Sequence, residues 1–259
     1  MNRAEKIKYY CISLISRKDR RDNIQKLFEK LEIEVSWWIV EKHPSGGIFG
    51  CSESHMMIWQ QKHETEYVCI FEDDLELFEE DCIERFRRCI KDIEKRGCRD
   101  YDLLNLEPGV GYYEEDGFFF SKRAKDEFRS GFATRLGCYF SESKRLNKLA
   151  EKVKPLYGMD IDLAIYGNCK MAITVVPLFR QNKELGTDND GGVHNIATYV
   201  SNYGLEFSRE LFTVMPGLGK LYMNCMSGVS YATASSKKIE LKDRRVNSSS
   251  FLLTGNDFL

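Results

Sequence analysis

Over its first two-thirds the chain alternates between short apolar runs and segments whose apolar residues recur at helical spacing. Apolar runs of strand length lie at Tyr9–Leu14, Ile33–Val40 and Tyr67–Phe71. Between them, apolar residues recur every three or four positions, first from Ile24 to Leu31 and then within residues 52–62. Runs of the first kind are typical of strands, and spacing of the second kind is typical of amphipathic helices. The pattern therefore predicts strands that alternate with helices.

The same alternation continues further along the chain. The later predicted strands are 102–106, 132–140 and 171–176, and the later predicted helices are 83–93 and 146–153. Residues 107–126 mix glycines, aromatics and charges without a period, which predicts a long loop. Strands that are apolar throughout indicate a sheet covered on both faces. We therefore predict an α/β fold with a mostly parallel central sheet flanked by helices. It should form one domain over residues 1–190, with an irregular C-terminal extension, 191–259, packed on the same domain.

The charge balance argues against a general polyanionic partner such as nucleic acid. The 259 residues include 38 Lys and Arg against 40 Asp and Glu, for a net charge of -2. The one dense basic stretch, Lys237–Arg245, also contains Glu240 and Asp243, which favours a solvated surface segment. No apolar stretch approaches the length of a transmembrane span. We expect neither a nucleic-acid partner nor a transmembrane segment.

Cysteine usage indicates a reducing compartment. The chain has nine cysteines, an odd number, and no Cys-x-x-Cys pair, which fits neither a disulfide framework nor a zinc ribbon. The first apolar stretch, Tyr9–Ile15, is short and is followed by Arg17–Arg21, which contains four basic residues. A secretion signal would have small residues at that point. We therefore expect a cytoplasmic or cytosol-like location and no signal peptide.

Three carboxylates, Glu72, Asp73 and Asp74, directly follow the predicted buried strand Tyr67–Phe71. Ligands of α/β sheets bind beyond the carboxyl ends of strands, and Mg²⁺ or Mn²⁺ prefers oxygen ligands together with substrate phosphates. Side chains alternate along a strand, which would pair Glu72 with Asp74, whereas a turn beginning at Asp73 would pair Asp73 with Asp74. Asp74 is a predicted metal ligand in either case. The alternative is that these are exposed acids placed before a helix N-terminus.

Other candidate residues admit both a structural and a functional interpretation. Asp160 and Asp162 precede apolar residues at helical spacing, so that either can be a helix cap or a catalytic acid. His55 shares a predicted helix face with Cys51. It can be a functional residue or a half-buried structural histidine held by hydrogen bonds. His194 lies near a glycine-rich loop and is a candidate on residue type alone.

Three basic residues, Arg17, Arg20 and Arg21, follow the first predicted strand. At the carboxyl end of a strand, guanidinium groups can bind the phosphates of a nucleotide. The alternative is a solvated first turn of the next helix.

Six short motifs occur in order along the chain. They are Ile12–Arg21, Gly50–His55 (Gly-Cys-x-x-Ser-His), Phe71–Leu75 (around Glu-Asp-Asp), Gly137–Ser141, Met159–Asp160 and Pro177–Gln181 (Pro-x-x-x-Gln). In these motifs and their order the chain resembles glycosyltransferase family 25, the lipooligosaccharide and collagen-type galactosyltransferases, over about residues 7–190. Ser13 replaces the asparagine that is usual in the family, and Met159 replaces its usual apolar residue.

The resemblance implies a GT-A-like nucleotide-sugar-binding fold. It also implies inverting transfer of a hexose, galactose or glucose, from a UDP-sugar to a hydroxyl of a glycan or of a hydroxylysine-type acceptor, with Mn²⁺ or Mg²⁺ as cofactor. The implied catalytic base is Asp160. The implied metal ligands are Asp74, Glu72 and His194, and the implied donor-binding residues are Ser13, Arg17, Arg20, Ser54, His55, Asp73 and Gln181.

Two other functions are considered. A phosphatase with an aspartyl nucleophile would need Asp-x-Asp-Gly after the strand, but Glu72 stands in the first position and no glycine follows. A non-catalytic protein derived from such a transferase could bind nucleotide-sugars or glycans, although the retention of Asp73, Asp74 and Asp160 argues against it.

Overall fold

The structure is a computed structural model, and it describes residues 6–108, 111–120, 127–133, 135–154, 161–165, 168–174, 176–186 and 188. The strands are β1 Ile7–Leu14, β2 Val35–Val40, β3 Tyr67–Glu72, β4 Leu75–Leu77, β5 Leu103–Asn105, β6 Gly111–Phe120, β7 Glu127–Ala133, β8 Cys138–Glu142, β9 Met171–Thr174 and β10 Phe179–Gln181. The helices are α1 Lys18–Leu31, α2 Gly47–Trp59, α3 Cys82–Arg96, α4 Ser143–Val153, α5 Ile161–Ile165 and the 3₁₀ turn η3 Lys183–Leu185. The predicted extension, 191–259, and the predicted site residues Asp160 and His194 lie outside the described residues.

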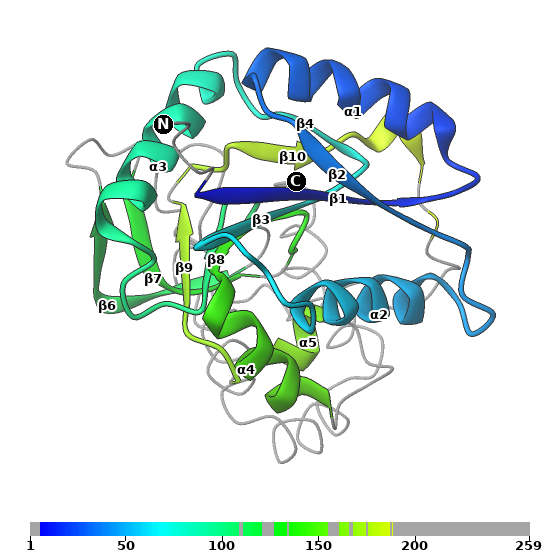
Figure 1. The fold of residues 1–259 in the computed structure, drawn as a ribbon. Coiled ribbons are helices and arrows are strands. Elements are labelled where there is room, and N and C mark those ends of the chain that lie inside the picture. The colour runs from blue at the N-terminus through cyan, green and yellow to red at the C-terminus, as the bar shows by residue number, and fades with distance from the viewer. Residues whose placement is uncertain are drawn as a thin grey trace, which may run out of the picture.

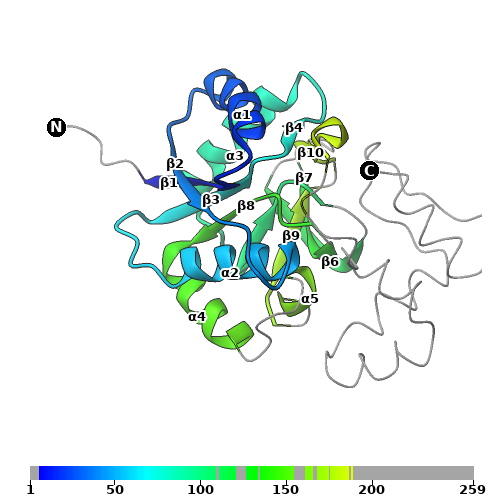
Figure 2. The same ribbon diagram turned by 90° about the vertical axis from the view of Figure 1, so that its right-hand side faces the viewer.

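A sheet of eight strands in the order β2-β1-β3-β8-β5-β9-β7-β6 forms the middle layer (Figure 1). In this described sheet six strands run in the same direction, and β7 and β8 run against them. Helices α1 and α3 cover one face, and α2, α4 and α5 cover the other, as the turned view in Figure 2 also shows. The predicted α/β class with a mostly parallel sheet between helices is confirmed.

The core forms around β3, whose residues Tyr67–Phe71 are all buried. Phe71 makes edge-on ring contacts with Phe28 of α1, Phe86 of α3 and Phe179 of β10. These contacts join both helices of one face, and the small β4–β10 sheet, to the strand that leads into the three carboxylates. The acidic motif therefore begins at the most firmly packed part of the sheet.

Two predicted segments differ from the structure. Within the predicted loop 107–126, residues 111–120 form β6, an edge strand whose pairing with β7 shifts register between Tyr113 and Phe118. A shift of this kind breaks the two-residue period by which a strand is recognised. The predicted strand 132–140 is in fact β7 and β8, separated at Arg135, which has a positive φ of 72°. A residue in that conformation cannot continue a strand.

Gly137, just before β8, allows a close approach beside the acidic motif. Its carbonyl accepts the backbone N–H of Glu72 at 2.8 Å. A Cβ atom added to Gly137 would lie 2.6 Å from Glu107 Oε2 and 2.9 Å from Leu75 Cδ2. Both neighbours are buried, so a methyl group fits there only if they move.

We expect Gly137→Ala to lower the free energy of unfolding by about 1–3 kcal/mol, the usual cost of overpacking. Urea unfolding followed by circular dichroism measures this. Gly50→Ala is the matched control, since its added Cβ would approach only the partly exposed His43, at 3.1 Å from Cβ. Alanine inside a helix is also favoured over glycine by about 0.5–1 kcal/mol. Equal destabilisation by the two substitutions would contradict the close-packing account of Gly137.

Candidate functional site

The carboxyl end of β3 places the three carboxylates at one edge of the sheet. The strand ends at Glu72, and Asp73 and Asp74 form a turn before β4. The backbone N–H of Asn182 donates to the carbonyl of Asp74 at 2.6 Å, which fixes this turn against the end of β10. Strand alternation therefore stops at Glu72, and the turn that begins at Asp73 brings Asp73 and Asp74 to the same guanidinium group.

That guanidinium belongs to Arg20, on the first turn of α1, whose side chain is only 7 % exposed. Its Nη1 lies 3.1 Å from Asp73 Oδ1, 3.5 Å from Asp74 Oδ2 and 3.2 Å from Asp188 Oδ2. Its Nη2 donates to the carbonyl of Gly186 at 2.5 Å. Arg20 therefore connects the acidic turn to the segment that follows η3.

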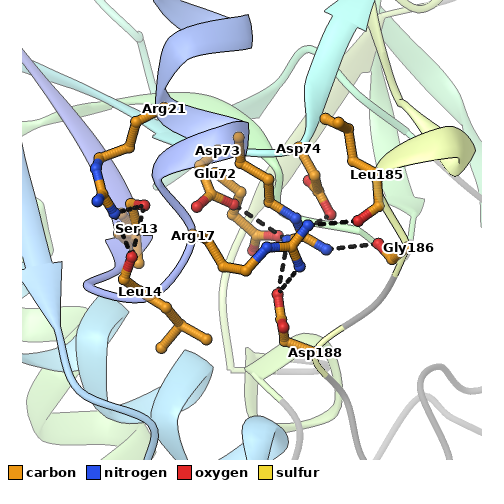
Figure 3. Close-up of polar contacts among 12 residues, drawn as sticks. Ser13, Leu14, Arg17, Arg21, Glu72, Asp73, Asp74, Leu185, Gly186 and Asp188 are labelled. Carbon is orange, nitrogen blue, oxygen red and sulfur yellow. Dashed lines mark hydrogen bonds and ion pairs between the residues drawn. The ribbon is translucent and has the colours of Figure 1, made fainter.

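Arg17 reaches the same segment from the residue before α1. It forms an ion pair with Asp188 at 2.5 Å and donates to the carbonyl of Leu185 at 2.5 Å. It also forms an ion pair with Asp19 at 2.9 Å. Figure 3 shows Arg17 beside Leu185 and Asp188. Arg17 and Arg20 thus share Asp188, and neither is a merely solvated residue of a helical turn.

Ser13 and Arg21 join the end of β1 to α1. The buried hydroxyl of Ser13 accepts a hydrogen bond from Arg21 Nη1 at 3.0 Å, and Arg21 also donates to the carbonyls of Leu14 and Ile15. Arg21 therefore orients the backbone that carries Arg17. Of the three basic residues predicted to meet a phosphate, Arg21 is the one held by β1.

The acidic turn has two buried oxygen atoms that lack a proton donor. Among the described residues, Asp73 Oδ2 and Asp74 Oδ1 have no hydrogen-bond partner. Burial, reinforced by the charge of Glu72, raises the pKa of Asp74 to about 7 although Arg20 opposes this. Burial also raises the pKa of Asp73. Oxygen atoms of this kind fit Mg²⁺ or Mn²⁺, since a hard cation would supply the missing positive partner.

Glu72 points to a different set of residues. His55 Nε2 lies 3.2 Å from Glu72 Oε1, and the thiol of Cys51 lies 3.6 Å from the same oxygen. Burial disfavours the ionised form of Glu72, but the hydrogen bond and charge of His55, with smaller effects of Cys51 and Arg20, outweigh this and lower its pKa. Glu72 is therefore an ionised partner of α2 in this structure.

A chain of hydrogen bonds fixes the ring of His55. Trp59 Nε1 donates to the hydroxyl of Tyr139 at 2.7 Å, and that hydroxyl lies 2.8 Å from His55 Nδ1. If the Tyr139 hydroxyl donates to Nδ1, the imidazole carries its proton on Nε2 and donates it to Glu72. Every proton in this series of hydrogen bonds then has an acceptor, as buried polar groups require.

A second acidic cluster lies at the same edge of the sheet, and of its members only Asp162 was a candidate from the sequence. Glu107 follows β5 and is buried, and Arg135 Nη1 lies 3.4 Å from its Oε1. The backbone N–H of Arg135 donates to Asp162 Oδ2 at 2.7 Å. Burial raises the pKa of Glu107 to about 8 and that of Asp162 to about 7, although Arg135 opposes both shifts. Perturbed carboxyl groups beside a candidate site are themselves site candidates.

A signal for Glu107 was present in the sequence, because it directly follows a predicted buried strand, as Glu72 does. The other predicted donor residues lie differently. The hydroxyl of Ser54 donates to the carbonyl of Gly50 at 2.6 Å within α2, whereas Gln181 lies at the end of β10 beside the acidic turn, paired with Leu75. The structure therefore brings Arg17, Arg20, Asp73 and Asp74 together, and it turns Ser54 toward its own helix.

Comparison with known proteins supports the family resemblance over the middle of the described chain. Residues 36–122 match the sequence model of glycosyltransferase family 25 (LPS biosynthesis protein). This stretch contains the Gly50–His55 and Glu72–Asp74 motifs, and over it the predicted resemblance is confirmed. No curated protein is significantly similar to the chain.

Two solved structures are similar to the chain at low sequence identity. One is a glycosyltransferase involved in the glycosylation of the major capsid of PBCV-1, with 9% identity, a TM-score of 0.42, and coverage of 71% of this chain and 96% of that chain. The other is A197 from STIV, with 14% identity, a TM-score of 0.36, and coverage of 68% of this chain and 83% of that chain. None of the described helices combines the length and apolar character needed to cross a membrane.

Glu107 predicts a pH dependence of stability. Its pKa is about 8 in the folded protein, against an ordinary value of 4.5. The folded state therefore holds this proton more tightly than the unfolded state does, and stability falls as pH rises from about 4.5 to about 8, by about 1.4 kcal/mol for each unit of pKa difference. We expect Glu107→Gln to flatten this part of the profile of stability against pH, measured by urea unfolding at several pH values.

Glu151→Gln, on the exposed side of α4, is the control and should keep the wild-type profile. Parallel profiles for the wild type and Glu107→Gln would contradict the burial of a protonated Glu107.

Proposed function

We propose that the protein is a metal-dependent inverting glycosyltransferase with a GT-A-like fold. It moves a hexose, galactose or glucose, from a UDP-sugar to a hydroxyl of a glycan or of a hydroxylysine-type acceptor. The observation that carries this proposal is the family 25 match over residues 36–122, because it includes the acidic motif whose carboxylates meet Arg20 in the fold. A match to a family of transferases favours transfer over the alternative of binding alone.

The donor diphosphate is proposed to bind at the carboxyl edge formed by β1 and β3. Arg17 and Arg20 lie there as cations, and Asp73 Oδ2 and Asp74 Oδ1 are the buried oxygens proposed to hold the cation. His194 remains a proposed third ligand. When bound, Mn²⁺ or Mg²⁺ neutralises negative charge that develops on the departing diphosphate.

In inverting transfer the acceptor hydroxyl attacks the anomeric carbon from the face opposite the diphosphate, and the hydroxyl proton passes to a base. We retain Asp160 as the proposed base. Asp162, two residues further on, has a raised pKa but accepts the backbone N–H of Arg135, which favours a positioning role. Arg20 would hold Asp73 and Asp74 in place throughout, since it contacts both carboxylates.

Asp74→Ala tests the metal assignment. We expect UDP affinity in the presence of Mn²⁺ to fall at least about 100-fold, or about 2.8 kcal/mol, because the variant lacks the carboxylate that joins the cation to the protein. Isothermal titration of UDP with and without Mn²⁺ measures the change. Glu76→Ala is the matched control, since Glu76 lies two residues away in a partly exposed ion pair with Arg180. Wild-type titration curves for Asp74→Ala would remove Asp74 from the metal site.

Asp160→Asn tests the base. We expect the variant to bind UDP and Mn²⁺ as the wild type does and to lose transfer by about 100-fold or more, in line with general-base catalysis. The assay follows labelled hexose from UDP-galactose or UDP-glucose into candidate acceptors. Asp162→Asn is run beside it and should keep transfer within about tenfold. If only Asp162→Asn loses transfer, Asp162 replaces Asp160 as the base, and full activity of Asp160→Asn refutes the assignment.

A further inference from the structure

Three donor atoms of different chemistry meet where α2 packs against the end of β3. Cys51 and His55 lie four residues apart on α2, so that both side chains project from one face of the helix toward Glu72. The thiol of Cys51, the imidazole of His55 and a carboxylate oxygen of Glu72 all lie within 4.8 Å of one another. Asp74 pairs with Arg20 and not with this group, although the charge of Glu72 still raises its pKa, so the group is centred on different atoms from the oxygens proposed above for Mn²⁺.

The spacing of these atoms is close to that of ligands around a tetrahedral zinc ion. Zn–N and Zn–O distances near 2.1 Å and a Zn–S distance near 2.3 Å place the oxygen about 3.4 Å from the nitrogen and about 3.6 Å from the sulfur. In the structure Glu72 Oε1 lies 3.2 Å from His55 Nε2 and 3.6 Å from Cys51 Sγ. Two of the three separations therefore already suit a cation, and the third, between Cys51 Sγ and His55 Nε2, is within 4.8 Å.

The residues behind His55 suit a metal ligand as well. A histidine that binds a metal through Nε2 carries its proton on Nδ1 and donates it to a nearby oxygen. The Tyr139 oxygen lies 2.8 Å from Nδ1, and its two lone pairs can accept from both His55 and Trp59, at the cost of the hydrogen bond that the Tyr139 O–H donates to Nδ1 when no ion is bound. The ring is fully buried and is held in its orientation before any ion arrives.

We propose that Cys51, His55 and Glu72 form a binding site for a thiophilic divalent cation, with Zn²⁺ as the best match. A thiolate and an imidazole select Zn²⁺ over Mg²⁺ and Mn²⁺, whereas the carboxylates of Asp73 and Asp74 have the opposite preference. Binding removes the thiol proton of Cys51, and the proton of His55 moves from Nε2 to Nδ1. The charges of the thiolate and the carboxylate then balance that of the ion, and water completes its coordination. This site does not depend on the function proposed above.

The test uses the full chain, stripped of metal with a chelator and titrated with Co²⁺, a spectroscopic substitute for Zn²⁺, in excess Mg²⁺ to occupy carboxylate sites. We expect a thiolate-to-cobalt charge-transfer band that Zn²⁺ removes. Absence of the band in the wild type overturns the proposal outright. This holds whether or not any variant folds.

Variants assign the band to its ligands. Cys51→Ser should abolish it and weaken Zn²⁺ binding at least about 100-fold in competition with a chromophoric chelator. Cys169→Ser is the matched control, since Cys169 is the other partly exposed cysteine of the described chain, and it should keep the band. Asp74→Asn should also keep it. A band that survives Cys51→Ser, or that disappears in Asp74→Asn, refutes a separate site at Cys51.

Discussion

The arrangement at the sheet edge depends on one buried cation, Arg20. Carboxylates that are removed from water need a positive partner, and here Asp73, Asp74 and Asp188 all lie within 3.5 Å of the same guanidinium nitrogen. Removal of Arg20 would leave these buried carboxylates without the cation that they share, which is costly. Because Arg20 lies on α1 and the carboxylates lie on two other segments, this cluster also fixes where those segments meet. The position of the candidate site is thus an electrostatic requirement as much as a result of packing.

Six strands of the described sheet run the same way, so that their carboxyl ends lie at one edge of the sheet. Residues that follow β1, β3 and β5 therefore gather there, and they include Arg17, Asp73 and Glu107. One of the two strands that run the other way, β8, also contributes, since Gly137 stands just before it and presents its carbonyl to Glu72. Apolar packing around Phe71 keeps this edge in a fixed relation to α1 and α3, the two helices of one face. Polar chemistry and core packing thus meet within a few residues of one strand.

Much of this could be predicted from the sequence, because local patterns carry it. The acids after β3 and the arginines after β1 are each recognisable within ten residues, and the alternation of strand and helix gave the fold class. The cluster of Glu107, Arg135 and Asp162 could not be predicted, since its contacts join positions about 30 residues apart and depend on a positive φ at Arg135. Strand β6 escaped detection because its register shift hides the alternation. The alternation of side chains along a strand likewise could not decide whether Glu72 or Asp73 lies beside Asp74, because a two-residue turn at Asp73 and Asp74 ends the strand.

The contacts of Asp188 have a consequence for any anion that enters the site. Arg17 and Arg20 already hold a carboxylate that comes from the chain itself, 2.5 Å and 3.2 Å away. An incoming phosphate that reaches these guanidinium groups must therefore exchange with Asp188 and does not fill an unneutralised pocket. Exchange of one anion for another leaves the local charge nearly unchanged. The affinity for the phosphate would therefore reflect how much more strongly Arg17 and Arg20 bind it than they bind the carboxylate of Asp188. The same exchange would release the Asp188 side chain alone, because Arg17 and Arg20 also donate to the carbonyls of Leu185 and Gly186 and so keep that backbone at the sheet edge.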